Sequence, residues 1–173
     1  MRVLHVLAQL PAKTGSGVYF TNVIEGLESF NHEQAALYGT SPEHNFNILD
    51  TVYEVEFEGK DLDFPIVGMS DIMPYNNTLY KDMTEEMVNS WENAFREKLL
   101  KAKEEFNPDV IITHHLWMLS SIVCEIFNDR KILGVCHNTD IRQAEKNPVM
   151  KEKYVLNLDK LDKVLALSSG QID

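Results

Sequence analysis

Short buried runs alternate with amphipathic segments along the chain, which is the pattern of an α/β sheet. Residues 2–9 form an apolar, β-branched run that is too short for a helix and ends before Pro11. A small-residue turn follows at 13–17. Apolar residues then recur at helical spacing, at Val18, Val23, Ile24, Leu27 and Phe30. This order predicts a buried strand, a glycine turn and the N-terminus of a helix.

Alternating residues after the first helix predict more strands. Residues 32–39 are expected to form the second strand. Residues 52–58 alternate strictly, with Tyr53, Val55 and Phe57 on one side and acidic residues on the other. Gly59-Lys60 then turns the chain and residues 62–66 alternate again. The pattern predicts an inserted β-hairpin with one solvated, acidic face.

A long amphipathic helix is predicted next, with Thr84 as its N-cap. Its apolar stripe contains Met87, Trp91, Ala94, Phe95, Leu99, Ala102 and Phe106. Beyond Pro108 the pattern predicts strands at residues 109–113, 131–136 and 163–167, a helix at 116–127, and a helical segment at 140–158 that breaks near Pro148. Strands that alternate with helices imply a mainly parallel sheet. The expected fold class is therefore a doubly wound, Rossmann-like α/β domain.

Composition and charge exclude several classes of partner. The chain has 173 residues, a formal net charge of −11 and a pI near 4.9. Such acidity argues against nucleic acid and anionic lipid, and no apolar run approaches the roughly 20 residues of a membrane span. The N-terminus lacks the pattern of a signal peptide. Cys124 and Cys136 fall in apolar segments, so we expect buried free thiols and a cytoplasmic protein.

The glycine turn at residues 13–17 is the first candidate for ligand binding. Free N–H groups and the positive end of the following helix would attract an anion, most simply a phosphate. The turn is not a dinucleotide fingerprint, because Phe20 stands where a third glycine is needed, and Lys13-Thr14-Gly15 is not the order of a Walker loop. A tight strand–helix turn that only requires a positive φ is the alternative.

Polar residues gather at the predicted ends of two strands. His114 and His115 follow the strand at 109–113. The strand at 131–136 is followed by His137, Asn138, Thr139, Asp140 and Arg142. In a parallel sheet these segments and the glycine turn emerge at one edge, which favours a shared site over separate structural imidazoles. No H-E-x-x-H or C-x-x-C motif is present, so no metal site is expected.

Four motifs, in order along the chain, carry a resemblance to a known family. They are VLHVLAQLPAKTGSGVYF at 3–20, PDVIITHHLW at 108–117, GVCHNTDIRQ at 134–143 and VLALSSGQ at 164–171. Together they resemble the N-terminal half of retaining glycosyltransferases of the GT-B fold, a nucleotide-sugar-dependent group. Enzymes of that family have two Rossmann-like domains with the active site between them. The N-terminal domain chiefly binds acceptor, and the C-terminal domain holds most of the nucleotide sugar.

The resemblance implies roles for individual residues. The loop that lines the donor phosphates and the acceptor pocket is matched by Gly15, Ser16 and Gly17. His137 matches the histidine that hydrogen-bonds a hydroxyl of the transferred sugar, and is the expected catalytic residue. The acceptor side would contain His114 or His115. The substrate-binding set is completed by Asn138, which replaces the family's usual glycine, and by Thr139, Asp140 and Arg142.

The expected function is that of the N-terminal half of an enzyme that moves a sugar from a UDP- or GDP-sugar to an acceptor with retention. No cofactor or metal ion is expected. Residues 1–173 would form the acceptor-side domain, and the ending after Ser168-Ser169 is interpreted as that of a fragment, inactive alone, whose nucleotide-sugar domain lies outside this chain. Two alternatives stay open: a non-catalytic nucleotide- or sugar-binding α/β module, and a sugar-nucleotide epimerase of GT-B fold.

Overall fold

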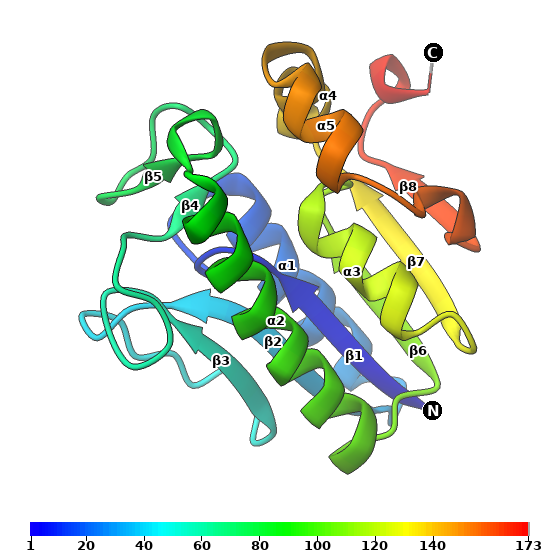
Figure 1. The fold of residues 1–173 in the computed structure, drawn as a ribbon. Helices are drawn as coiled ribbons and strands as arrows, with labels where there is room; N and C mark the ends of the chain where they lie inside the picture. Colours follow the sequence, from blue (N-terminus) through cyan, green and yellow to red (C-terminus); the bar gives the residue numbers. More distant parts are fainter. Residues whose placement is uncertain (173) are drawn as a thin grey trace.

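The computed structural model describes residues 1–172 and contains one large sheet whose strands all run parallel (Figure 1). The sheet has six strands in the order β3-β2-β1-β6-β7-β8. Their bounds are β1 Arg2–Leu7, β2 Glu33–Thr40, β3 Val52–Glu56, β6 Val110–His114, β7 Lys131–Cys136 and β8 Lys163–Ala166. The predicted doubly wound, mainly parallel α/β fold is confirmed.

Helices cover both faces of this sheet (Figure 1). The α-helices are α1 Gly15–Glu28, α2 Glu85–Glu105, α3 Met118–Ile126, α4 Asn138–Lys146 and α5 Pro148–Tyr154. Short 3₁₀ turns are η1 Tyr80–Asp82, η2 Leu158–Lys160 and η3 Ser169–Gln171. α1 lies on one face of the sheet, whereas α2 and α3 lie side by side on the other. The predicted break in the last helical segment is where α5 begins, at Pro148.

The core forms because alternate residues of the central strand β1 point to opposite faces. Leu4 and Val6 belong to the larger cluster, which contains Trp91 and Phe95 of α2. Leu7 packs on the other face in a cluster with residues of α1. Both aromatic rings are fully removed from water, and their burial on the α2 side stabilises the fold.

The structure confirms α2 and changes the predicted buried stripe of α1. In α2 the Thr84 hydroxyl accepts a hydrogen bond from the Met87 N–H at 3.2 Å, as expected for an N-cap. In α1, Val18 is 50% exposed and Phe30 is 65% exposed and lies beyond the helix. Of the predicted stripe, Ile24 is buried as expected, and the helix also buries Gly17 and Phe20, which the predicted stripe did not include.

The predicted β-hairpin is wrong. β3 pairs in parallel with β2, and residues 62–66 form no strand apart from a single parallel bridge between Phe57 and Leu62. The alternation itself holds, because Tyr53, Val55 and Phe57 are buried. Alternation reports which side of a strand is buried but not the direction of its partner, and here a parallel partner was already available. A separate parallel pair, β4 Val67–Gly68 and β5 Thr78–Leu79, follows.

Between β1 and β6 the order of the sheet reverses, since the chain runs outward from β1 through β2 to β3 and then returns to β6 on the other side. Ligands of open α/β sheets bind at such a switch point, beyond the carboxyl ends of the strands. Cys124 and Cys136 are both buried and unpaired, as expected.

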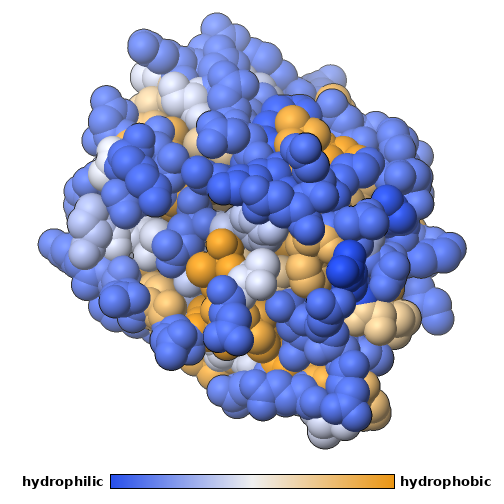
Figure 2. Space-filling view, turned by 90° about the horizontal axis from the view of Figure 1, so that it is seen from below, coloured by the Kyte–Doolittle hydropathy of each residue, from blue (hydrophilic) through white to orange (hydrophobic). Residues whose placement is uncertain are grey.

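Within residues 1–172 none of the helices combines the length and the apolar composition that a membrane crossing needs. Figure 2, seen from below the view of Figure 1, shows a largely hydrophilic face on which hydrophobic atoms gather in small areas.

Candidate functional site

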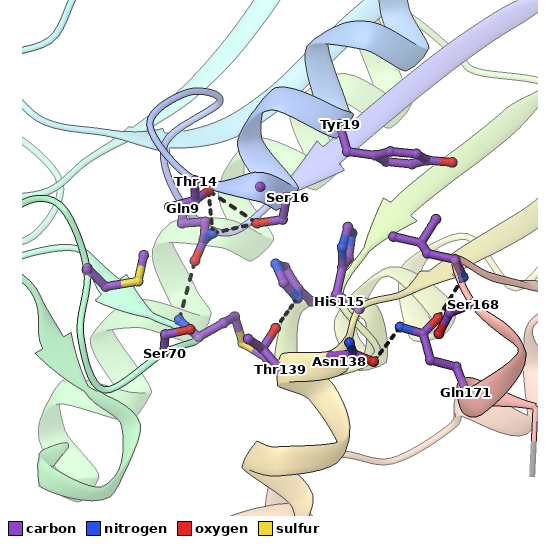
Figure 3. A pocket seen from close by; sticks show the side chains of 15 residues that line it. Gln9, Thr14, Ser16, Tyr19, Ser70, His115, Asn138, Thr139, Ser168 and Gln171 are labelled. Carbon is purple, nitrogen blue, oxygen red and sulfur yellow. Dashed lines mark hydrogen bonds between the residues drawn. The ribbon is translucent and has the colours of Figure 1, made fainter.

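A cleft of about 440 Å³ opens at the switch point (Figure 3). It is bounded by the turn after β1, the loop after β4, and the segments after β6, β7 and β8. Its polar side chains are hydroxyls, amides and imidazoles, from Gln9, Thr14, Ser16, Tyr19, Ser70, His115, His137, Asn138, Thr139, Ser168 and Gln171. Among the described residues that line it, none is Asp, Glu, Lys or Arg.

The N-terminus of α1 forms one wall of the cleft. Thr14 caps the helix by accepting the Gly17 N–H at 3.0 Å, and the Ser16 hydroxyl is held by the Gln9 amide at 2.8 Å. Within residues 1–172 the N–H groups of Gly15 and Ser16 have no protein acceptor. These two donors stand at the positive end of the 14-residue helix, and both residues line the cleft.

Gly17 does not line the cleft, contrary to its expected role in contacting a ligand. A Cβ atom at this position would lie 2.6 Å from the Ala12 nitrogen and 2.7 Å from the Leu10 oxygen, both backbone atoms. The glycine is therefore required because the turn packs against the helix. The alternative of a positive φ is also wrong, since the described glycines have none and the left-handed residue of this turn is Lys13, with φ 64°.

Three histidine rings meet at the carboxyl ends of β6 and β7, as the strand-end pattern predicts. The centroids of His115 and His137 are 4.4 Å apart, and those of His114 and His137 are 5.8 Å apart. His115 and His137 line the cleft, whereas His114 lies beneath it, fully buried against Phe20 of α1.

Asp140 is a buried carboxylate that organises this cluster. Its Oδ1 lies 2.6 Å from His115 Nδ1, and its Oδ2 accepts the backbone N–H groups of Leu116 at 2.8 Å and His137 at 2.9 Å. Asp140 does not line the cleft; it joins the end of β6 to the start of α4 from behind the His115 ring. Thr139 Oγ1 is 3.3 Å from the same His115 nitrogen (Figure 3).

Burial lowers the pKa of two of the three imidazoles, those of His114 and His137. Desolvation lowers the pKa of His137 to about 4, and the neighbouring His115 lowers it further than the Asp140 carboxylate raises it. Desolvation also lowers the pKa of His114 well below its usual range. No partner within residues 1–172 reaches the buried Nε2 atoms of His115 and His137.

Two glutamines that sequence reasoning missed hold the opposite wall. Gln9 Oε1 accepts the Met69 N–H at 3.3 Å, and Gln143 Nε2 donates to the Met69 carbonyl at 2.8 Å. Both amides are buried. Together they fix the loop that carries Ser70 and Met73 into the cleft. The only signal was position: Gln9 ends the first predicted strand segment, and Gln143 ends the third motif.

The other predicted residues divide between two hollows. Asn138 and Thr139 line the main cleft at the N-terminus of α4, and the amide of Gln171 donates to Asn138 Oδ1 at 2.9 Å. Asn138 lies inside α4, so its position does not require the glycine of the resembled motif. Arg142 lines an adjacent hollow of about 310 Å³ that shares Thr139 with the main cleft.

The described residues offer no arrangement for a metal ion. Within 1–172, no group of three or more His, Cys, Asp or Glu side chains is placed to hold one. The proximity of His115, His137 and Asp140 is instead explained by hydrogen bonding, because the carboxylate accepts three bonds from the segments that carry the two histidines.

Comparison with known proteins identifies the fold. No family model and no curated protein sequence matches the chain. Sucrose-phosphate synthase from Thermosynechococcus elongatus has a TM-score of 0.63 at 13% identity, over 99% of this chain and 44% of that one. UDP-GlcNAc 2-epimerase from Neisseria meningitidis, bound to UDP-GlcNAc, has a TM-score of 0.57 at 11% identity, over 98% of this chain and 41% of that one.

A third similar structure is the N-terminal domain of trehalose-6-phosphate phosphatase from Candida albicans, with a TM-score of 0.54 at 18% identity, over 94% of this chain and 39% of that one. The chain therefore spans about two fifths of the structures that it matches. Its fold is the Rossmann-like GT-B fold of the matched part of these structures, as the motifs implied.

Proposed function

We propose that this chain is the acceptor-side part of a glycosyltransferase that uses a UDP- or GDP-sugar and retains the configuration of the transferred sugar. One observation carries the proposal: an uncharged, polar cleft at the switch point places the free N–H groups of α1 opposite two imidazoles whose Nε2 atoms have no partner within 1–172. Helix N–H groups suit a phosphate, and neutral hydroxyl, amide and imidazole groups suit a sugar.

Each wall of the cleft has its own role in the proposed reaction. The N–H groups of Gly15 and Ser16 stabilise the negative charge that grows on the leaving diphosphate, and as fixed dipoles they do so without reorganisation. The imidazole of His137 hydrogen-bonds a hydroxyl of the transferred sugar. The apolar side chains of Met69 and Met73 pack against the carbon faces of the sugar. Cations that neutralise the diphosphate come from outside this cleft, whose described lining has none.

The side chains of the site favour transfer over epimerisation. A non-catalytic nucleotide- or sugar-binding module would use the same helix N–H groups and imidazoles, so turnover is what distinguishes it from a transferase. An epimerase must remove a proton from a sugar carbon, and a carboxylate in the cleft would suit that task. The described lining has no carboxylate. The carboxylate of Asp140 lies near the cleft, but it already takes part in three hydrogen bonds within the protein.

The test uses the intact gene product with UDP-glucose, UDP-GlcNAc and GDP-mannose. We expect release of UDP or GDP, and proton NMR of the product gives the configuration at the anomeric carbon. An inverted sugar C2 with the nucleotide still attached would identify an epimerase instead. Inversion at the anomeric carbon would refute retention, and saturable binding without any turnover would support the non-catalytic module.

A matched pair of variants tests the phosphate contact. Ser16→Asp puts a carboxylate at the start of α1, where it stabilises the helix but repels a phosphate, so donor affinity should fall while the fold persists. Asn22→Asp adds the same charge on an exposed part of α1 outside the cleft and should leave affinity unchanged. Equal affinities for the two variants would exclude the N-terminus of α1 as the phosphate site.

A further inference from the structure

Gln9 is a buried glutamine whose side-chain amide joins two walls of the cleft (Figure 3). On one side its Oε1 accepts the Met69 N–H at 3.3 Å. On the other side its Nε2 donates to Ser16 Oγ at 2.8 Å and to Thr14 Oγ1 at 3.3 Å. Both ends of the amide therefore have partners inside the protein. Neither the motifs nor the proposed function assigns a role to this residue.

The backbone of Met69 fixes the orientation of the Gln9 amide. A backbone N–H can only donate, so the Gln9 atom that faces it must be the oxygen. The amide nitrogen must then face the hydroxyls of Thr14 and Ser16. Gln143 Nε2 donates to the Met69 carbonyl at 2.8 Å, so the backbone that sets this orientation is itself held from a second side.

Two hydroxyls transmit this orientation to the cleft. A hydroxyl has one proton to donate and two lone pairs that can accept. Thr14 Oγ1 accepts the Gly17 N–H at 3.0 Å and the Gln9 amide, which occupies both lone pairs. Within residues 1–172 the remaining partner of Thr14 Oγ1 is Ser16 Oγ at 3.3 Å, so Thr14 must donate to it. Ser16 Oγ therefore accepts from both Gln9 and Thr14.

The proton of the Ser16 hydroxyl is left without an acceptor in the described part of the chain, because Thr14 has no lone pair to offer it. Ser16 lines the cleft, and its hydroxyl proton joins the free N–H groups of Gly15 and Ser16 at the positive end of α1. The start of α1 thus presents three donors. Ionised phosphoryl oxygens accept without donating, so one phosphate can satisfy all three.

The histidines of the cleft independently indicate a ligand. His115 and His137 line the same cleft and are only 3% and 7% exposed. Their Nε2 atoms are buried and have no hydrogen-bond partner within residues 1–172. Buried polar groups in proteins are nearly always hydrogen-bonded. Unpaired imidazole nitrogens and unpaired donors that line one cleft therefore mark the place of a polar ligand.

From these bonds we propose that Gln9 is a positioning residue for the donor diphosphate, because it holds the Ser16 hydroxyl as a third fixed donor to a phosphoryl oxygen. This role rests on the proposed function. Gln9 acts through Ser16 and not on the ligand, since its own amide is fully used within the protein. The hydroxyl is oriented before the diphosphate arrives, so little freedom is lost when the charge-assisted bond forms.

The binding test uses calorimetry on the intact gene product with UDP and GDP, each compared with its nucleoside. Ser16→Ala should weaken binding of the preferred diphosphate about 10-fold or more, the scale of one hydrogen bond to a charged group, and should change nucleoside binding little. Ser16→Thr retains the hydroxyl and should stay close to the wild type. Gln9→Met replaces the amide with an uncharged chain of similar length and should weaken diphosphate binding several-fold.

Gln34→Met is the matched control for the loss of a glutamine amide. The Gln34 side chain bonds to His5 and to the Ile24 carbonyl and does not line the cleft. Its replacement should leave diphosphate binding unchanged. Circular dichroism and thermal unfolding show which variants are folded.

A double-mutant cycle separates the positioning role from a structural one. Gln9→Met should weaken diphosphate binding in the wild type but hardly at all in the Ser16→Ala background. A loop that merely moves when the Met69 N–H loses its partner would weaken binding by the same factor in both backgrounds. Equal factors, or a Ser16→Ala variant with wild-type affinity, would overturn the proposal and leave the proposed function intact. A wild type that binds UDP and GDP no better than their nucleosides would refute the phosphate site itself.

An NMR measurement covers the case in which Gln9→Met does not fold. The side-chain amide signals of glutamine report the hydrogen bonds of both Nε2 protons, and Ser16→Ala identifies the Gln9 signal because it removes the main partner of that amide. Saturating UDP or GDP should shift this signal in the wild type, because donation by Ser16 Oγ to a phosphate strengthens the bond that Ser16 accepts. The nucleoside should leave it in place. A Gln9 signal that does not move at saturating diphosphate would overturn the proposal.

Discussion

His137 contributes a ring nitrogen to the cleft wall, and removing it tests the motif resemblance. We expect His137→Ala to reduce kcat more than donor binding, because a hydrogen bond to the transferred sugar strengthens as charge develops. The expected loss is about 2–4 kcal/mol in transition-state stabilisation, the range for one preorganised donor. Steady-state kinetics measures this loss, with His32→Ala as the control because His32 stacks on Phe30 and does not line the cleft. A folded His137→Ala variant with wild-type kinetics would place the sugar elsewhere in the cleft.

Buried histidines also make stability depend on pH. Desolvation lowers the pKa of both His5 and His137 to about 4, below the ordinary value of 6.5 that each has in the unfolded chain. Between these pH values the unfolded chain binds more protons, so the free energy of unfolding falls as pH falls from about 6.5 towards 4. Each fully titrating histidine contributes about 1.4 kcal/mol per pH unit.

Urea unfolding between pH 7 and pH 4 measures this dependence. His5→Gln should reduce the slope, because glutamine is uncharged and can still bond to Gln34, the partner of His5 Nε2 at 2.8 Å. His32→Gln is the matched substitution outside the core and should leave the slope unchanged. Equal slopes in the wild type and His5→Gln would show that His5 does not titrate on unfolding.

At the residue scale, the sequence predicted which histidines lie together at the site but not the hydrogen bonds that hold them there. The positions of His115 and His137 after two strands of one parallel sheet were enough to bring their rings together. The bond between His115 and Asp140 could not be predicted, because it depends on the left-handed turn at His115. Gln9 and Gln143 were missed because a glutamine amide gives no signal in the sequence until its partner, here the Met69 backbone, is known.

At the scale of elements, the N-terminus of α1 depends on a close backbone approach that only glycine permits. The sequence suggests that Gly17→Val costs about 1 kcal/mol, the scale of a strained glycine. Because an added Cβ would meet backbone atoms of Leu10 and Ala12 at 2.6–2.8 Å, which cannot rotate away, we now expect about 3 kcal/mol or more.

Gly15→Ala provides the control in the same turn, since nothing lies within 4 Å of its added Cβ and its φ is not positive. Thermal unfolding should show Gly15→Ala near the wild type and Gly17→Val clearly lower. A Gly17→Val variant as stable as Gly15→Ala would mean that the turn between β1 and α1 relaxes freely.

Elements with a long, one-sided pattern were predictable, and those whose pairing depends on distant strands were not. The stripe of α2 has enough turns to define its buried face, and Trp91, Phe95 and Leu99 are fully buried. Residues 62–66 have the alternation of a strand, but they join no strand of the sheet even though β3 lies at its edge, and only the isolated bridge between Phe57 and Leu62 forms. Secondary-structure periodicity is a local property, whereas strand pairing is decided by the whole sheet.

At the scale of the whole molecule, one edge of the sheet is left uncovered in the described structure. All four residues of β8 are exposed although the strand pairs with β7, and Val164 is 52% and Leu165 43% exposed. Next to this edge, Leu167, Ser168 and Gln171 line the cleft. The site therefore opens beside apolar surface, and the matched structures extend well beyond the length of this chain.

The net charge of the molecule predicts the nucleotide affinity and the turnover of residues 1–173 on their own. A diphosphate entering the cleft meets two free helix N–H groups but no described lysine or arginine, in a chain of net charge −11. One helix terminus cannot offset the long-range repulsion and the entropy lost on binding. We expect this chain to fold, to bind UDP or GDP only weakly by calorimetry, and to release no nucleotide from UDP-glucose or GDP-mannose over many turnovers. Multi-turnover transfer by these 173 residues would show that the cationic contacts are not needed, and would refute a site divided between two domains.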